Sequence, residues 1–370
     1  MKNLIYSKQF INERYYAYKF ILYITYIIYN IYNIEMFVLL LWIYPIVVYS
    51  TTFNCSTVSS SSYHDDRKNQ YIWTLAQYNV EWLFTEPCSS CPGICTWSTS
   101  SEQYTHLNTI QDVLNTMDAD TVHMCEVQSC TQLEQVKPST EYNSYMIQGD
   151  DTYTGQNVGL ITKIDPVDSL TRTEERVSYP IPSSQCGYTG EPGTVGVTKH
   201  MITRFIIQNT SIYLIGAHLL SDPNDPYACA RREAQAQVLQ YKIQSFIEDG
   251  HEVVVIGDLN DYDGVYLDVN NNVPNSHVLE ILKGNSGYAT NYTLYTIADK
   301  ILQDARYTEW YDENMNCKSD SNEFSMIDHI LVSKKMWNYI DTVVFYHIYS
   351  EECNTYQSDH YPIMVSFYFE

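Results

Sequence analysis

Short apolar runs recur along most of this chain and are separated by polar stretches rich in turn-forming residues. The runs are rich in β-branched and aromatic residues, which is typical of strands. We predict strands at 71–82, 119–127, 157–164, 200–207, 211–220, 253–258, 325–332, 341–348 and 361–369. Residues 253–256 form an uninterrupted β-branched run, as expected of a strand buried on both faces.

Three segments instead show the spacing of helices. Residues 101–117 repeat apolar side chains three or four positions apart, with Ser101 as a predicted cap. The apolar face of this predicted helix consists of Leu107, Ile110, Leu114 and Met117. A long amphipathic helix is predicted at 228–250 and ends at Gly250, and a short one is predicted around 277–283.

The order of these elements predicts an α/β protein with two packed sheets flanked by helices. Several predicted strands follow one another too closely for helical crossovers, so antiparallel hairpins must lie beside α/β units. One domain over 71–370 accounts for the pattern. Residues 51–70 are polar and rich in Ser and Thr, which predicts a linker.

The N-terminal part has a different pattern. Residues 20–49 are almost continuously apolar or Tyr-rich, and Glu35 interrupts them. Residues 1–50 are therefore interpreted as a signal peptide, with an alternative start at Met36, or as a signal anchor. Either interpretation sends the chain into the secretory pathway, as a secreted or luminal protein or as one anchored in the membrane.

Cysteines and glycosylation sequons agree with export. The sequons begin at Asn54, Asn209 and Asn291. All ten cysteines lie after residue 50, and in an oxidising compartment they are predicted to form disulfide bonds. A zinc or iron–sulfur site at 88–95 is the alternative, but its three cysteines have no obvious fourth ligand.

The formal net charge is −23, which argues against a protein that grips nucleic acid through a basic face. It leaves open an enzyme that contacts nucleic acid briefly, because local fields and bound cations can reverse the sign of the charge at a site.

Polar residues able to bind a metal or a phosphate group stand near the ends of several predicted strands. They are Asn79 and Glu81, Glu126, His218, Asp258 and Asn260, Asp328, and Asp359 with His360. A single strand end of this kind, such as 253–264 taken alone, is more simply interpreted as a surface turn. The repetition of the pattern at six places predicts a functional site.

In this order, the residues resemble the endonuclease/exonuclease/phosphatase superfamily. The resemblance runs from 71 to 370 and includes Gly257-Asp258-x-Asn260 and Ser358-Asp359-His360. It implies a four-layer α/β sandwich, in which two mixed β-sheets pack face to face and are flanked by helices. This agrees with the prediction made from the pattern of elements.

The resemblance also implies a metal ion. Glu126 would be its main ligand, with Asn79 beside it and Asp359 completing the shell. Mg²⁺ prefers such oxygen ligands and keeps water positions open for a substrate phosphate, and Mn²⁺ or Ca²⁺ are alternatives.

The remaining residues would carry out the acid–base and electrostatic work. His360 would accept a proton from water, and Asp328 would hold its tautomer. His218 and Asn260 would donate hydrogen bonds to phosphate oxygens, and Asp258 would orient the water.

Some neighbouring residues receive no role. Glu81 is interpreted as a structural or surface residue, and alternation would point His329 to the opposite sheet face. Asp261 and Asp263 match a calcium loop only in part. No carboxylate partner for His218 is evident, which sets the chain apart from pancreatic-type deoxyribonucleases.

These observations predict a secreted, divalent-metal-dependent phosphodiesterase, a monomer most similar to a DNase-like nuclease. The alternatives are a sphingomyelinase-like or inositol-phosphate phosphoesterase and a catalytically inactive binding module. The substrate would be nucleic acid or, alternatively, phospholipid, with transient membrane contact only if the N-terminal segment is retained. The small number of Lys and Arg residues, 21 in all, argues against inositol phosphates.

Overall fold

The computed structural model describes residues 55–58, 63–85, 97, 99–222, 224–285, 291–347 and 357–370. The chain divides into the units Met1–Thr51 and Thr52–Glu370, and the description concerns the second unit. The predicted N-terminal signal segment lies outside the described residues. Within them, no helix is long and apolar enough to cross a membrane.

Two large sheets form the centre of the domain. The six-stranded sheet has the order β14-β15-β1-β2-β4-β3 and the five-stranded sheet the order β10-β13-β9-β8-β7. The first consists of β1 (Ile72–Leu83), β2 (Thr121–Val127), β3 (Asn143–Met146), β4 (Asn157–Thr162), β14 (Ile340–Phe345) and β15 (Ile363–Tyr368). The second consists of β7 (Lys199–Ile207), β8 (Thr210–His218), β9 (Glu252–Asp258), β10 (Tyr295–Thr296) and β13 (Asp328–Val332).

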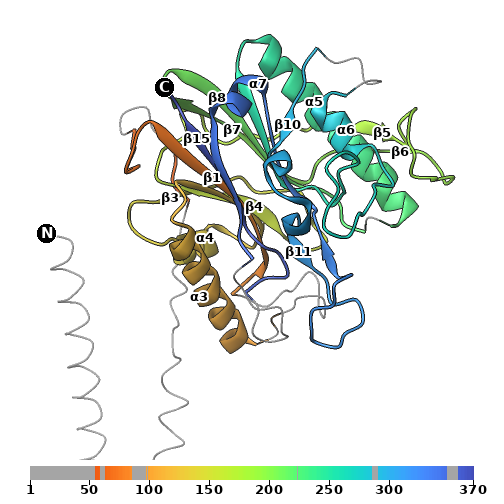
Figure 1. Cartoon of the computed structure of the whole chain (residues 1–370), viewed down its shortest axis with the longest axis horizontal. Coiled ribbons are helices and arrows are strands. Elements are labelled where there is room, and N and C mark those ends of the chain that lie inside the picture. Colours follow the sequence, from red (N-terminus) through yellow and green to blue (C-terminus); the bar gives the residue numbers. More distant parts are fainter. Residues whose placement is uncertain are drawn as a thin grey trace, which may run out of the picture. The chain divides into compact units, whose positions relative to one another are not determined.

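Smaller elements complete the chain. Two-stranded sheets pair β5 (Val177–Tyr179) with β6 (Gly193–Val195) and β11 (Glu309–Trp310) with β12 (Phe324–Ser325). The helices are α3 (Ser100–Met117), α4 (Cys130–Val136), α5 (Pro226–Glu248), α6 (Val278–Lys283) and α7 (Lys334–Tyr339), with 3-10 turns η1 (Ile297–Lys300) and η2 (Gln303–Ala305). Figure 1 shows α3 and α4 on one side of the sheets and α5 and α6 on the other.

Three apolar layers separate these elements and confirm the four-layer sandwich. The layer between the sheets contains Trp73 of β1 and Val254 of β9. A second layer packs α5 and α6 on the five-stranded sheet, and a third packs α3 and α4 on the other. Alternation along β1 puts Trp73 and Leu75 in the central layer and Ala76 and Tyr78 under α3.

The helix caps follow from the local sequence. Thr99, two residues before the predicted helix start, is the cap in place of the predicted Ser101: it accepts a hydrogen bond from the backbone of Glu102, whose side chain accepts the Thr99 backbone N–H in return. Asp225 caps α5, and Pro226 lies in its first turn, where the backbone N–H that proline lacks would have no partner within the helix. The long helix therefore begins before the predicted residue 228.

The predicted linker at 51–70 is wrong for the residues that the structure describes, because they pack on the domain. Cys55 is bonded to Cys130 of α4, and Asp65 forms a β-bridge with Ile164. Arg67 is buried and donates its guanidinium to Asp65 at 2.9 Å. Polar composition misled the prediction because these polar groups satisfy one another.

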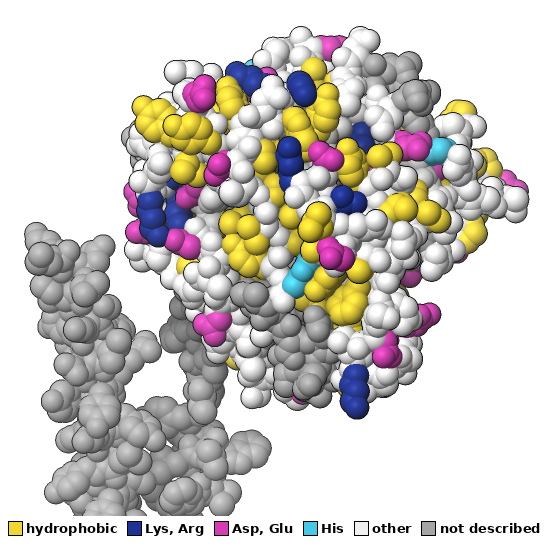
Figure 2. All heavy atoms as spheres, viewed as in Figure 1, with side chains coloured by type: hydrophobic (Ala, Val, Ile, Leu, Met, Phe, Trp, Pro, Cys, Tyr) yellow, Lys and Arg dark blue, Asp and Glu magenta, His cyan; other side chains and the backbone are white. Residues whose placement is uncertain are grey.

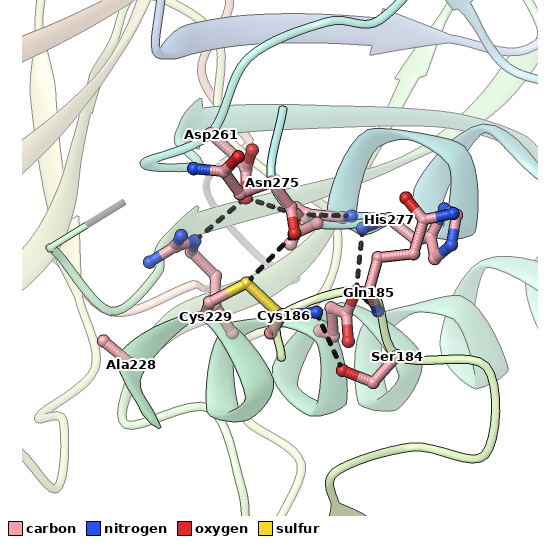
Figure 3. The surroundings of a disulfide bond; sticks show 12 residues. Ser184, Gln185, Cys186, Ala228, Cys229, Asp261, Asn275 and His277 are labelled. Atoms are coloured by element: carbon pink, nitrogen blue, oxygen red, sulfur yellow. Dashed lines mark hydrogen bonds and ion pairs between the residues drawn. A yellow bond between two sulfur atoms is a disulfide. The ribbon is translucent and has the colours of Figure 1, made fainter. Parts of the chain in front are cut away.

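The second disulfide bond described, Cys186–Cys229, ties the segment between β5 and β6 to the first turns of α5 (Figure 3). Three residues after Cys229, Arg232 of α5 donates to Asp261 at 3.1 Å, so the loop after β9 is held by the same helix. Cys317 is also disulfide-bonded.

The prediction of disulfides is wrong for Cys125, which is free and buried. It lies on β2 and packs in the layer between the sheets, where no second cysteine faces it among the described residues. Cys88, Cys91, Cys95 and Cys353 lie outside the described residues, as does the sequon at Asn54. Asn209 and Asn291 are exposed.

Candidate active site

The inner faces of the two sheets become polar at one common edge. Strands β1 and β2 are parallel, and so are β8 and β9, so their carboxyl ends lie together in each sheet. Strand β13 runs antiparallel to β9, which places its first residue, Asp328, opposite Asp258, the last residue of β9. His218, at the end of β8, is also opposite Asp258.

Alternation decides which polar residues face this edge. On β9, Val254 and Ile256 pack between the sheets, and Asp258 continues the same face. On β13 the inward face contains Asp328 and Ile330, whereas His329 points the other way. His329 Nε2 lies 2.8 Å from the backbone oxygen of Asp261. This contact is outside the predicted site, in agreement with the prediction that His329 points to the opposite face.

Asp328 and His360 form a buried pair in which the carboxylate lies 2.6 Å from His360 Nδ1. The other oxygen of Asp328 accepts a hydrogen bond from Gln77 Nε2 at 3.0 Å. The amide oxygen of Gln77 is in turn 2.6 Å from Nδ1 of the buried His123. The sequence prediction missed Gln77, although it precedes Asn79 by two residues and therefore shares its sheet face.

Asn79 lies at the centre of the predicted site. Its Nδ2 is 3.2 Å from Glu126 Oε1, 3.0 Å from Asp258 Oδ2 and 3.3 Å from His360 Nε2. Four predicted residues from four separate segments therefore meet at one amide group. Ser358, from the same predicted motif as His360, donates to the Asn79 backbone oxygen at 2.8 Å.

Glu126 reaches the site through an irregularity of β2. The β1–β2 and β2–β4 registers both shift near this residue, and Glu126 has a positive φ of 67°. Its Oε2 accepts the Trp82 backbone N–H at 3.0 Å. Simple alternation would have placed Glu126 on the same face as Met124, under the helices.

His218 and Asn260 line the same edge from the second sheet. His218 Nε2 is 3.5 Å from Asp258 Oδ2 and also 3.5 Å from Lys199 Nζ. Asn260 donates its backbone N–H to Asp258 at 3.0 Å and its side chain to the Leu219 oxygen at 3.2 Å. The side chain of Asn157, on β4, accepts the backbone N–H of Gly149 and donates to the backbone oxygen of Gln128, so it is engaged away from His218.

Asp359 occupies the outer part of the group. Its backbone N–H donates to Glu81 Oε2 at 3.1 Å, so Glu81 has the structural role predicted for it. Its carboxylate lies 3.9 Å from His360 Nε2. The sequence prediction also missed Glu309, whose backbone forms a β-bridge with His360 and whose carboxylate accepts from Ser325 Oγ at 2.5 Å.

The charges of the site are strongly coupled. Burial, followed by the charge of Asp328, raises the pKa of Asp258 to about 8. Burial raises the pKa of Asp359 to about 7, with Glu126 contributing in the same direction. Burial alone would lower the pKa of His360, but Asp328 and Asp359 outweigh it, so this pKa is raised well above its usual value.

Burial is the main cause of these raised pKa values, and repulsion by neighbouring carboxylates, Asp328 on Asp258 and Glu126 on Asp359, adds an excess of negative charge. A divalent cation relieves such an excess, so the residues fit the metal that the resemblance implies. Among the described residues, no three His, Cys, Asp or Glu side chains are already arranged around one metal position. Glu126, Asn79 and Asp359 remain the predicted ligands.

A sequence model of the endonuclease/exonuclease/phosphatase family matches residues 76–360, which include every predicted site residue. The chain belongs to this family. The match begins in β1 and ends at His360. The members of the family are phosphoric ester hydrolases. No curated protein matches the chain.

Three solved structures are similar to most of this family member. Humanized D. rerio TDP2 is 17% identical over 80% of this chain and 99% of its own, with a TM-score of 0.49. A Bacteroides vulgatus endonuclease/exonuclease/phosphatase is 16% identical over 81% and 99%, also with a TM-score of 0.49. A functionally unknown conserved protein from Enterococcus faecalis V583 is 14% identical over 80% and 100%, with a TM-score of 0.48.

Proposed function

We propose that this family member is an exported, Mg²⁺-dependent phosphodiesterase that cleaves nucleic acid. The observation that carries the proposal is the Asp328–His360 pair beside the group formed by Asn79, Glu126 and Asp258. An inactive binding module of the same fold has no need of a buried Asp–His pair aimed at a carboxylate cluster.

The contact with Asp328 fixes the orientation of the His360 imidazole ring. Because the carboxylate of Asp328 lies at Nδ1, the opposite nitrogen Nε2 faces the cluster, 3.3 Å from Asn79 and 3.9 Å from Asp258. His360 Nε2 and Asp258 Oδ2 are thus close enough to titrate together. In the proposed reaction the pKa values of both groups would be lower with the cation bound, and the deprotonated pair would take the proton from the attacking water.

His218 and Asn260 act on the phosphate group. Burial, together with the nearby Lys199, lowers the pKa of His218 well below its usual value, so its neutral ring donates one N–H. That donor and the amide of Asn260 would stabilise the charge that grows on the phosphate oxygens in the transition state. Glu126, Asn79 and Asp359 would hold Mg²⁺, which supplies Lewis-acid stabilisation of that charge.

Other features of the structure bear on export and on the nature of the substrate. The described disulfides and the exposed Asn209 and Asn291 agree with passage through an oxidising compartment. Figure 2 shows acidic, basic and apolar side chains intermixed on the face in view, without a continuous basic surface. Binding of nucleic acid would therefore depend on the site and its metal rather than on a general positive field.

The test is nicking of supercoiled plasmid by the full chain, produced in an oxidising secretory host and supplied with Mg²⁺. We expect nicking that a chelator abolishes and that His360→Gln reduces by at least about 100-fold. His251→Gln is the matched control, because residue 251 precedes β9 at the opposite end of the sheet.

Two other results would contradict the proposal. Chelator-sensitive release of phosphocholine from sphingomyelin, without nicking, would keep the enzyme and replace the substrate. Inactivity toward plasmid, RNA, sphingomyelin and inositol phosphates, by a protein that still unfolds cooperatively, would favour the non-catalytic binding module.

A further inference from the structure

The loop between β11 and β12 carries oxygen-bearing side chains with the spacing of a calcium-binding loop. When Asp312 is counted as position 1, such residues occupy positions 1, 3, 5, 9 and 12, the side-chain ligand positions of a twelve-residue calcium loop. They are Asp312, Asn314, Asn316, Asp320 and Glu323. Position 7, which supplies a main-chain oxygen in such loops, is Lys318.

The backbone agrees with this numbering. Position 6 of a calcium loop is a sharp turn that normally requires glycine. Here it is Cys317, and its φ of 62° is the left-handed conformation that glycine adopts most easily. The backbone N–H groups of Asn316 and Cys317 donate to the two carboxylate oxygens of Asp312, at 3.0 and 2.8 Å.

The side chains of the loop converge on Asp320. Its Oδ2 accepts Nδ2 of Asn314 at 2.8 Å and Nδ2 of Asn316 at 3.0 Å. The same Asn314 amide is 3.1 Å from Glu323 Oε1. The amide oxygens of Asn314 and Asn316 accept the backbone N–H groups of Asn316 and Lys318, at 3.0 and 2.7 Å, and each oxygen has a second lone pair that can bind a cation. The three carboxylates, Asp312, Asp320 and Glu323, are not yet arranged around one metal position in the described structure, so binding of the ion would draw them together.

Glu323 points to a cation independently of the spacing. Its side chain is buried, with only 4% of the residue exposed, and its oxygens accept from Trp310 Nε1 and the Asp320 backbone, both at 3.0 Å. All of its described hydrogen-bond partners are neutral. In the described part of the chain, no Lys, Arg or His forms an ion pair with Glu323 or Asp320. A buried carboxylate is costly without a positive partner.

Elsewhere in the described structure, buried carboxylates form ion pairs with buried Arg and Lys side chains. Asp261 and Asp263 are each 2% exposed, and they pair with the buried Arg232 and Lys283 respectively. These two are the residues that matched a calcium loop only in part. They are already neutralised by protein cations, whereas Glu323 is not.

We propose that residues 312–323 bind Ca²⁺. Ca²⁺ accepts six to eight oxygen ligands in flexible geometry, which suits three carboxylates, two amides and one main-chain oxygen, whereas Mg²⁺ demands a smaller octahedral shell. The ion would close the end of the β11–β12 hairpin. That hairpin supports the catalytic loop, because Trp310 donates its backbone N–H to the Asp359 oxygen at 2.8 Å.

The experiment is a calorimetric titration of the full chain with Ca²⁺ in excess Mg²⁺. We expect one Ca²⁺ per chain with a Kd between about 10⁻⁵ and 10⁻³ M, and a rise of the thermal midpoint on binding. Glu323→Gln and Asp312→Asn should each weaken binding by at least about tenfold. Glu323→Gln keeps an acceptor for Trp310, so its fold can be checked by circular dichroism.

Glu313→Gln is the matched control, because it removes the same charge from the same loop at position 2, which holds no ligand. It should bind Ca²⁺ as the unaltered chain does. Equal weakening in all three variants would reduce the site to general electrostatic attraction, and absence of Ca²⁺ binding would overturn the proposal. Glu126→Gln should leave this Ca²⁺ affinity unchanged, which separates the loop from the catalytic site.

Discussion

At the scale of the residue, the decisive feature is that His360, the proposed general base, is positioned through a series of buried partners. His360 depends on Asp328, and Asp328 depends on Gln77, which binds His123. Of these contacts, only the one between His360 and Asp328 could be predicted, because both residues lie in motifs of the family that the sequence resembles. Gln77 and His123 carry no motif, and their contact appears only when β1 and β2 are paired.

Asp328→Asn tests the first of these contacts. The substitution keeps the size of the side chain but offers an N–H where His360 Nδ1 needs an acceptor, so the ring is held in the wrong tautomer. We expect kcat to fall by about 10² to 10⁴, with little change in KM. Steady-state rates on a fluorescent oligonucleotide measure both constants.

Asp341→Asn serves as the control for Asp328→Asn, since Asp341 is an exposed residue of β14. It should behave like the unaltered chain. If Asp328→Asn retained full kcat, the pair at 2.6 Å would be structural rather than catalytic.

At the scale of the element, the short strand β11 and the residue before it connect the two halves of the Asp–His pair. Thr308 Oγ1 accepts the backbone N–H groups of Ile327 and Asp328, at 3.1 and 3.0 Å. The Thr308 backbone oxygen accepts Tyr361 N–H at 2.8 Å, next to His360. One fully buried residue therefore holds both Asp328 and His360 in place.

Thr308→Val should separate this positioning role from general packing. Valine has nearly the same shape but leaves two buried backbone donors without an acceptor, which costs about 1–3 kcal/mol of the free energy of unfolding. We also expect kcat to fall by about tenfold or more while KM stays similar, because a small displacement of a catalytic group is sufficient for this.

Thr308→Ser retains the hydroxyl group and should restore most of the kcat. Measurement of kcat, KM and urea unfolding for the two variants distinguishes a positioning role of Thr308 from a packing role. A loss of stability in Thr308→Val without any loss of kcat would show that Thr308 only packs the loop.

The elements themselves were largely predictable, and the exceptions have physical causes. Alternation along β13 excluded His329 from the predicted site, and the same alternation along β1 and β9 explains which of their residues face inward. The inward turn of Glu126 depends on a register shift that no residue type signals. The packing of the segment around Arg67 was missed because a buried ion pair is polar in sequence and resembles a solvated linker.

At the scale of the whole molecule, stability should depend on the neutrality of buried histidines. Burial lowers the pKa of His106 to about 4, that of His123 to about 3 and that of His200 to about 4. In the unfolded chain these groups titrate near 6.5, so below that pH the unfolded state binds more protons than the folded state. The free energy of unfolding should therefore fall between about pH 6.5 and pH 4. The raised pKa values of Asp258 and Asp359 act in the opposite direction and partly offset this loss.

His106→Gln isolates one histidine from this sum. His106 Nε2 lies 2.7 Å from the Val80 oxygen, and a glutamine amide can donate to the same oxygen without titrating. We expect urea unfolding at pH 7 to change little. Between pH 6.5 and pH 4 the variant should lose about 2–3 kcal/mol less stability than the unaltered chain, since each unit of pKa difference corresponds to about 1.4 kcal/mol. Parallel pH profiles for the two proteins would mean that His106 is protonated in the fold, and the acid sensitivity would then have to come from other groups.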